Sequence, residues 1–159
     1  MMAIEVCDSL QSCTKLFNDL AVSVGILLAV FFYTKNQFIA TYENLNDRFL
    51  DFMQLQIAHP GLGTDTYDRA VVPLTAAADI ARRKAIFEFL CSILERAFLY
   101  LNNGHDRHLC WKKAEWVEWE KWILAYCQNP NFVQFWCAIR DQSCYSTEFV
   151  EYMKKHIPA

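Results

Sequence analysis

The longest apolar stretch of this chain runs from Leu20 to Tyr33 and reads LAVSVGILLAVFFY. Fifteen uncharged residues separate Asp19 from Lys35; as an α-helix they span about 22 Å, whereas a bilayer's hydrocarbon core is about 30 Å thick. Extending the segment to Leu16 and Asn36 gives about 31 Å. Polar residues near the edge of a bilayer cost much less than at its centre, and flanking lysines extend towards the headgroups. The stretch therefore predicts one transmembrane helix.

Insertion of this stretch is favourable by a modest margin. Nine of its residues are Leu, Ile, Val or Phe, and each contributes about −0.3 to −0.6 kcal/mol, so their sum is about −3 to −5 kcal/mol before the polar residues subtract. Three aromatic residues, Phe31, Phe32 and Tyr33, stand at its end, as in an interfacial belt. The residues assigned to the membrane anchor are Leu20, Val22, Val24, Ile26, Leu27, Leu28, Val30, Phe31, Phe32 and Tyr33.

Two other interpretations of the stretch compete with the membrane anchor. A cleaved signal peptide needs a basic leader and small residues at its cleavage site, whereas Glu5 and Asp8 precede this stretch and Tyr33-Thr34-Lys35 ends it. A buried core or oligomerisation helix of a soluble protein has a similar length and stays an alternative. The absence of a polar face over four turns favours the membrane anchor.

Basic residues near the two ends predict the orientation. Only Lys15 lies on the N-terminal side, among acidic residues, whereas Lys35 and Arg48 follow the stretch, so we expect a cytoplasmic C-terminal domain. Cysteine usage agrees, because seven cysteines without a CxxC pair suit reduced thiols better than a disulfide framework.

The remaining sequence predicts an all-α fold. The membrane helix continues as a long amphipathic helix to His59, before Pro60, with apolar positions at three- and four-residue steps, namely Phe38, Tyr42, Leu45, Phe49, Phe52 and Leu55. A loop with a short turn follows over 60–73. An antiparallel bundle of four further helices is expected over about 73–101, 107–128, 130–142 and 147–156. The predicted divisions are an N-terminal segment (1–18), a membrane helix (19–35) and a bundle domain (36–159).

Capping residues and a tryptophan stripe support these helices. Asp106, Asn129 and Ser146 are expected at the N-caps of the last three, and Pro130 suits a first helical position. The 107–128 segment carries an aromatic stripe within about 120° of arc, which predicts core packing. Its members are Trp116, Trp119, Trp122, Ile123 and Tyr126, with Trp111 at the edge as the most exposed tryptophan. The other faces of this helix carry the charged residues Lys112, Lys113, Glu120 and Lys121.

Signals for chemistry are few. The candidate metal ligands are His105, His108 and Cys110. A structural zinc site needs a fourth ligand and a recognisable pair of ligands such as CxxC or HxxxH, and both are missing here. Glu88 and Glu95 lie on one face of a helix, and we expect them to be solvated or paired with basic residues rather than catalytic. No nucleophile or phosphate-loop motif is present, and the net charge of −3 argues against nucleic acid. We therefore expect neither a cofactor nor enzymatic activity.

The order of these features resembles a scattered group of small bacterial proteins that have one N-terminal membrane helix followed by a Trp-rich helical bundle. The matching pieces are Phe87-Glu88, Leu94-Glu95, Trp116-x-x-Trp119-x-x-Trp122, Pro130-Asn131-Phe132 with Trp136, and Tyr145 to Phe149. These are packing motifs, and the group has no established activity. The resemblance implies the anchored topology only.

The sequence therefore favours a single-pass membrane-anchored helical module that acts by protein–protein interaction, as a scaffold, a sensor or a subunit of a membrane complex. The expected partners are the membrane and either another protein or a second copy. The alternative is a soluble all-helical binding protein in which residues 20–33 are a buried or oligomerisation helix. A third possibility is an enzyme or metal-binding protein that uses Glu88, Glu95 or the His105 cluster.

Overall fold

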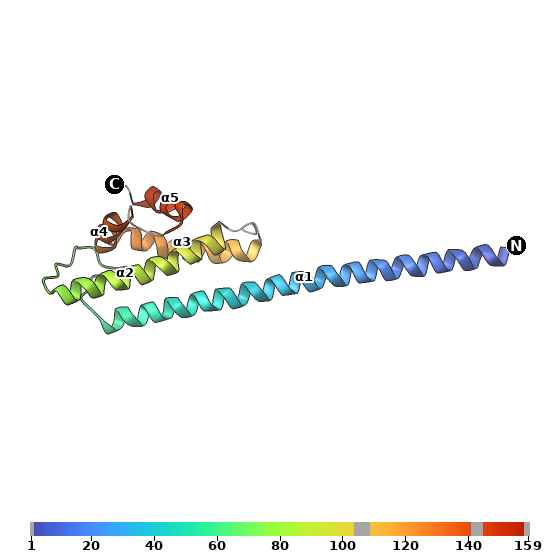
Figure 1. Cartoon of the computed structure of the whole chain (residues 1–159), viewed down its shortest axis with the longest axis horizontal. Coiled ribbons are helices and arrows are strands. Elements are labelled where there is room, and N and C mark those ends of the chain that lie inside the picture. Colours follow the sequence, from blue (N-terminus) through green and yellow to red (C-terminus); the bar gives the residue numbers. More distant parts are fainter. Residues whose placement is uncertain (1, 104–108, 141–144, 158–159) are drawn as a thin grey trace. The chain divides into compact units, whose positions relative to one another are not determined.

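The computed structural model describes residues 2–103, 109–140 and 145–157, and side chains from residue 15 onwards except that of residue 16. In these residues the chain forms helices and no strand (Figure 1), in the order α1 (Met2–Ala58), α2 (Ala77–Ala97), the π-helix η1 (Phe98–Asn102), α3 (Cys110–Cys127), α4 (Pro130–Ile139) and α5 (Thr147–His156). The predicted all-α fold, with one long helix followed by four shorter α-helices, is confirmed.

The chain divides into two compact units. Unit 1 is Met1–Asn44, and unit 2 is Leu45–Ala159. Helix α1 contributes to both, because it continues without a break until Ala58, where Pro60 excludes helical conformation in the residue before it. The predicted end of this helix is thus confirmed to within one residue.

The part of α1 in unit 2 packs through one face. Leu45 and Phe52 are buried, and the Phe49 ring lies 5.2 Å from the Trp119 ring and 5.1 Å from the Trp122 ring. Gln56 completes this face, where its amide donates to the hydroxyl of Tyr126 at 3.1 Å. The placement of Leu55 on the core face was wrong: Leu55 is 38% exposed. Leu55 lies about 100° from Gln56 around the helix. Gln56 therefore points towards the core, and Leu55 points away from it.

The aromatic stripe of α3 lies in the core of unit 2, as predicted. Trp116, Trp119, Ile123 and Tyr126 are buried, whereas Trp111 and Trp122 are half-buried. Lys112 departs from the expected solvated face, because it is only 5% exposed. Its ammonium lies 4.4 Å from the centre of the Tyr100 ring and donates to the Tyr100 carbonyl at 3.3 Å, so a cation–π contact and a hydrogen bond compensate for its burial.

Helix α2 starts later than predicted. We expected it to begin at Pro73 or Leu74, but Ala76 is still extended and the helix begins at Ala77. The chain before it is held by Asn131 of α4, which accepts from the Val72 amide at 2.7 Å and donates to the Ala70 carbonyl at 3.1 Å. The Val72 carbonyl, which would accept the first hydrogen bond of a helix starting at Pro73, accepts instead from Arg83 Nη1 at 2.8 Å.

Buried Asn129 joins the loop to the bundle. Its side-chain oxygen accepts from the amides of Asn131 and Phe132 at 2.7 and 3.0 Å, which confirms the predicted N-cap of α4 with Pro130 in the first turn. Its side-chain nitrogen donates to the carbonyls of Gly63 and Asp65. One amide therefore satisfies backbone groups in two segments far apart in sequence.

The starts of α3 and α5 differ in two details from the predicted ones. Leu109 is extended and α3 begins at Cys110 rather than at residue 107, while the predicted cap Asp106 lies outside the described residues. Ser146 is at the N-cap of α5, as expected, but its hydroxyl makes no capping hydrogen bond. Instead its backbone amide donates to the Glu95 carboxylate at 2.5 Å. A side chain from α2 thus stabilises the start of α5.

Candidate membrane-spanning segment

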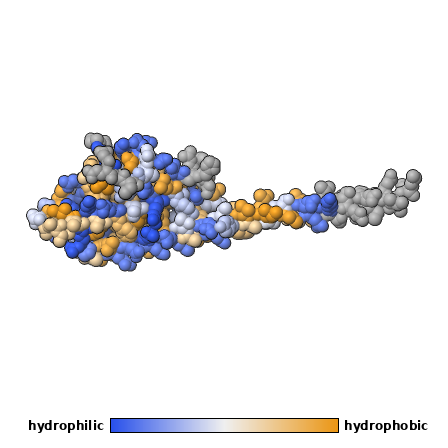
Figure 2. All heavy atoms as spheres, in the orientation of Figure 1, coloured by the Kyte–Doolittle hydropathy of each residue, from blue (hydrophilic) through white to orange (hydrophobic). Residues whose placement is uncertain are grey.

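The candidate site is the apolar part of α1 in unit 1. One helix among the described residues is long and apolar enough to cross a membrane, and its apolar window has a mean hydropathy of 1.7 with no buried residue. All ten residues assigned to the anchor are exposed, from 44% at Phe31 to 69% at Leu27. Figure 2 shows this stretch of α1 as hydrophobic surface. Such an exposed apolar surface needs a non-aqueous partner.

The Ser23 and Thr34 hydroxyls of this segment are satisfied within the helix itself. The Ser23 hydroxyl donates to the Asp19 carbonyl at 2.8 Å, and the Thr34 hydroxyl donates to the Phe31 carbonyl at 2.9 Å. The backbone is helical throughout, so its amides and carbonyls bond along the helix. A lipid-exposed segment must satisfy its polar groups internally in this way.

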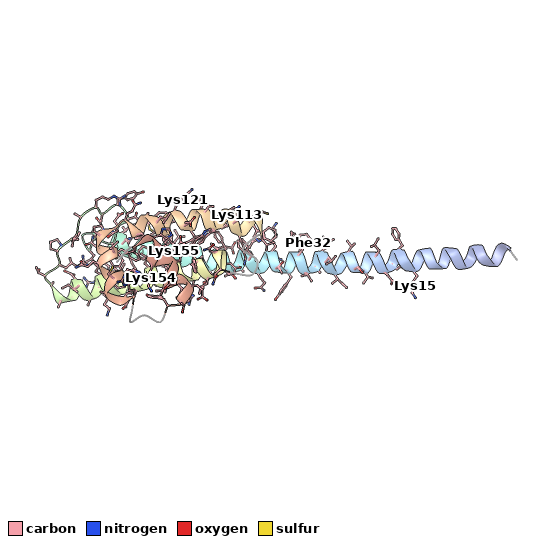
Figure 3. All side chains as sticks on the ribbon, turned by 90° about the horizontal axis from the view of Figure 1, so that it is seen from above. Lys15, Phe32, Lys113, Lys121, Lys154 and Lys155 are labelled. Carbon is pink, nitrogen blue, oxygen red and sulfur yellow. The ribbon has the colours of Figure 1, made fainter. Side chains whose placement is uncertain are left out.

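The ends of the segment match the thickness of a bilayer. Lys15 and Lys35 are both exposed and are twenty residues apart, which corresponds to about 30 Å of helix. Phe17 is 75% exposed and stands near one end, while Phe32 and Tyr33 stand near the other. Figure 3 shows the Lys15 and Phe32 side chains projecting from the ribbon of α1. Phe17 lies within the extended segment predicted from Leu16 to Asn36, although Asp19 separates it from the apolar run.

The two glutamates considered for acid–base chemistry have ordinary structural partners. Glu88 is half exposed, and its carboxylate lies 3.7 Å from the Lys84 ammonium. Glu95 accepts the hydrogen bond from Ser146 described above. Neither residue lines either of the cavities of about 410 and 430 Å³ found in unit 2. Glu88 thus has the expected basic partner, whereas Glu95 binds a backbone amide, and the two carboxylates do not face these cavities as a pair.

The candidate metal ligands are only partly described. Cys110 is exposed with a free thiol, while His105 and His108 lie outside the described residues. Elsewhere in the described chain, no three His, Cys, Asp or Glu residues gather closely enough to hold a metal ion. Burial raises the pKa of the Cys91 thiol, and it raises that of Cys127 to about 12, so these two thiols are poor nucleophiles at neutral pH.

Comparison with known proteins finds no matching family model, no similar curated protein and no similar solved structure. The functional argument therefore depends on the residues and the structure themselves.

Proposed function

We propose that this chain is a single-pass membrane-anchored helical module, with residues 19–35 in the bilayer, that acts through protein contacts rather than catalysis. The observation that carries the proposal is the exposure of all ten apolar anchor residues, on a helical segment whose Ser23 and Thr34 hydroxyls bond to carbonyls of the same helix. In water, that surface would be a strong aggregation liability, whereas lipid chains solvate it.

The proposed orientation places the C-terminal domain in the cytoplasm. The positive-inside rule supports it, since Lys35 and Arg48 follow the segment and only Lys15 precedes it nearby. Free thiols also support it, because Cys91, Cys110, Cys127 and Cys137 are unpaired among the described residues. A reducing compartment preserves such thiols.

Protein contact is the proposed mode of action because the candidate acid–base residues Glu88 and Glu95 are engaged in structural contacts and the Cys91 thiol is buried. A helical bundle tethered to a membrane can hold a binding surface close to other membrane components. The scaffold, sensor and subunit roles all need this tether.

The experiment is extraction of native membranes containing the full chain. Sodium carbonate at high pH should leave the chain in the pellet, and a mild detergent should release it. Accessibility of Cys110 and Cys137, both exposed, to a membrane-impermeant maleimide then measures orientation. We expect labelling only after the cells are opened.

A matched pair of variants sharpens the test. Leu27→Arg places a charge at the centre of the segment, where Leu27 is 69% exposed, and changes the insertion free energy by about 3–4 kcal/mol, which is close to the whole favourable sum. Leu50→Arg makes the same change at a 58% exposed position of α1 in unit 2. Carbonate should release the first variant and leave the second in the membrane.

Two results would overturn the proposal. Release of the native chain by carbonate alone would identify a soluble or peripheral protein, in which residues 20–33 pair with a protein surface. Equal retention of both arginine variants would show that the apolar segment does not hold the chain in the membrane.

A further inference from the structure

A cavity in unit 2 is independent of the membrane segment. It lies between α2 and α4, beside Leu74, and its volume is about 410 Å³, within the range of small-molecule sites. The apolar part of its lining includes Phe87, Phe135 and Ile139. The Phe87 ring is fully buried and lies 5.3 Å from the half-buried Phe135 ring, so it supports Phe135 in the wall from behind.

The polar lining of this cavity is basic and neutral, without an acidic residue. It comprises Arg83, Lys84, Asn131 and Gln134. Both polar atoms of the Asn131 side chain are engaged with the loop, as described above. The amide of Gln134 is exposed and has no partner among the described residues. Lys84 is bound only loosely, by Glu88 at 3.7 Å.

Arg83 carries a positive charge that no described carboxylate neutralises. Its Nη1 atom donates to the Val72 carbonyl at 2.8 Å and to the Asn131 side-chain oxygen at 3.1 Å, while Nε and Nη2 have no partner in the described chain. Partial burial lowers the pKa of Arg83, with no acidic neighbour opposing this effect. A guanidinium with spare donors beside an apolar wall favours a carboxylate or a similar anion.

We propose that this cavity binds a small amphiphilic carboxylate, with its acid group at Arg83 and Lys84 and its apolar chain along Ile80, Phe135 and Ile139. The neutral donor of Gln134 is available for the second carboxylate oxygen. The ligand class combines one negative charge with an apolar chain, because the cavity has one charged and one apolar part. A free acid and a membrane-derived fatty acid share this chemistry.

The experiment is methyl NMR of the full chain in phosphatidylcholine nanodiscs, with ¹³C-labelled isoleucine δ1 methyl groups. Ile80 and Ile139 line the cavity, whereas Ile123 is fully buried elsewhere in the core and serves as an internal reference. Hexanoate should shift the first two signals saturably and leave the third unchanged. Hexanol, which lacks the charge, and acetate, which lacks the chain, should each bind at least about tenfold more weakly.

Two variants and their controls locate the site. Ala138→Phe fills the cavity from α4 and should abolish the shifts, while Ala114→Phe adds the same bulk at an exposed position of α3. Lys84→Gln should weaken hexanoate binding about three- to fivefold, since one exposed charge is removed. Lys121→Gln removes a similarly exposed lysine, paired with Glu118, and should leave binding unchanged.

Each outcome decides the proposal. Absent shifts, equal binding of hexanol, or binding that survives Ala138→Phe would overturn it. Loss of hexanoate binding in Ala138→Phe and a weaker response in Lys84→Gln, with both controls at native affinity, would support it. Oleate incorporated in the nanodiscs tests the membrane source: shifts at Ile80 and Ile139 would assign the ligand to the bilayer, and binding of hexanoate alone would assign it to solution.

Discussion

The apolar residues of unit 1 and those of unit 2 meet very different surroundings. Phe32 in the membrane segment is 56% exposed, whereas Phe132 in α4 is fully buried among the Phe87, Tyr126 and Phe135 rings. Both side chains lie in regular helices and are chemically identical. The partner of the ring therefore differs: in unit 2 it is other side chains, and in unit 1 we propose that it is lipid.

The same contrast applies to polar groups. In unit 1 the hydroxyls of Ser23 and Thr34 bond to carbonyls of their own helix. In unit 2 the amide of Asn129 joins α4 to a loop more than sixty residues earlier. Unit 1 is thus stabilised locally, while unit 2 depends on tertiary contacts.

The largest expected effect comes from removing one phenyl ring in each region. Phe132→Ala should destabilise unit 2 by about 3–5 kcal/mol, because it opens a cavity in a fully buried cluster. Phe32→Ala should change the unfolding of unit 2 by less than about 0.5 kcal/mol. Denaturation followed by tryptophan fluorescence measures this, since all five tryptophans lie in unit 2. Equal effects would contradict the division into a locally and a tertiarily stabilised region.

Asn129→Ala should give the next largest loss of stability, about 2–4 kcal/mol. It removes the α4 cap and leaves the carbonyls of Gly63 and Asp65 without their donor. Asn129→Asp keeps the capping oxygen but loses the donor, so we expect an intermediate loss. Ser23→Ala, whose hydroxyl bonds only to its own helix, should leave the unfolding of unit 2 unchanged. The same fluorescence denaturation separates these variants.

Glycine substitutions provide a smaller contrast. Gly63→Ala should cost about 1–3 kcal/mol, because Gly63 has φ +71° and an added Cβ would lie 2.7 Å from the Asn131 side-chain nitrogen. Gly61→Ala shares the positive φ but meets no atom within 4 Å, and should cost less. Gly25→Ala also meets nothing within 4 Å and should favour the helix by about 1 kcal/mol. Thermal unfolding checks unit 2, and helical content in micelles checks unit 1.

The last contrast concerns the thiols, whose effect on stability is confined to high pH. Because burial raises the pKa of Cys127 from 9.0 to about 12, the folded state holds this proton more tightly than the unfolded state, and stability should fall as pH rises from about 9 to 12. At pH 8 iodoacetamide should modify Cys110 and Cys137, which are exposed, far faster than Cys127 or Cys91. Mass spectrometry of the modified peptides measures this. Comparable rates at all four sites would contradict the burial of the last two.

Much of the fold was predictable because local sequence patterns determine where its helices begin, end and pack. The α1 end at Pro60, the Asn129-Pro130 start of α4 and the tryptophan stripe of α3 all follow from backbone rules and helical periodicity. The errors occur where tertiary contacts intervene. Asn131 holds the chain before α2 extended, and Tyr100 compensates the burial of Lys112, which charge alone placed on the surface.

The membrane prediction depends on the sequence alone, while the cavity needed the tertiary structure. Hydropathy and length along one helix identify a segment able to span a bilayer, because each residue's transfer free energy is nearly independent of distant residues. The proposed carboxylate site joins Ile80 and Arg83 of α2 to Phe135 and Ile139 of α4. These residues are about fifty positions apart, and only the packing of the two helices brings them to one cavity.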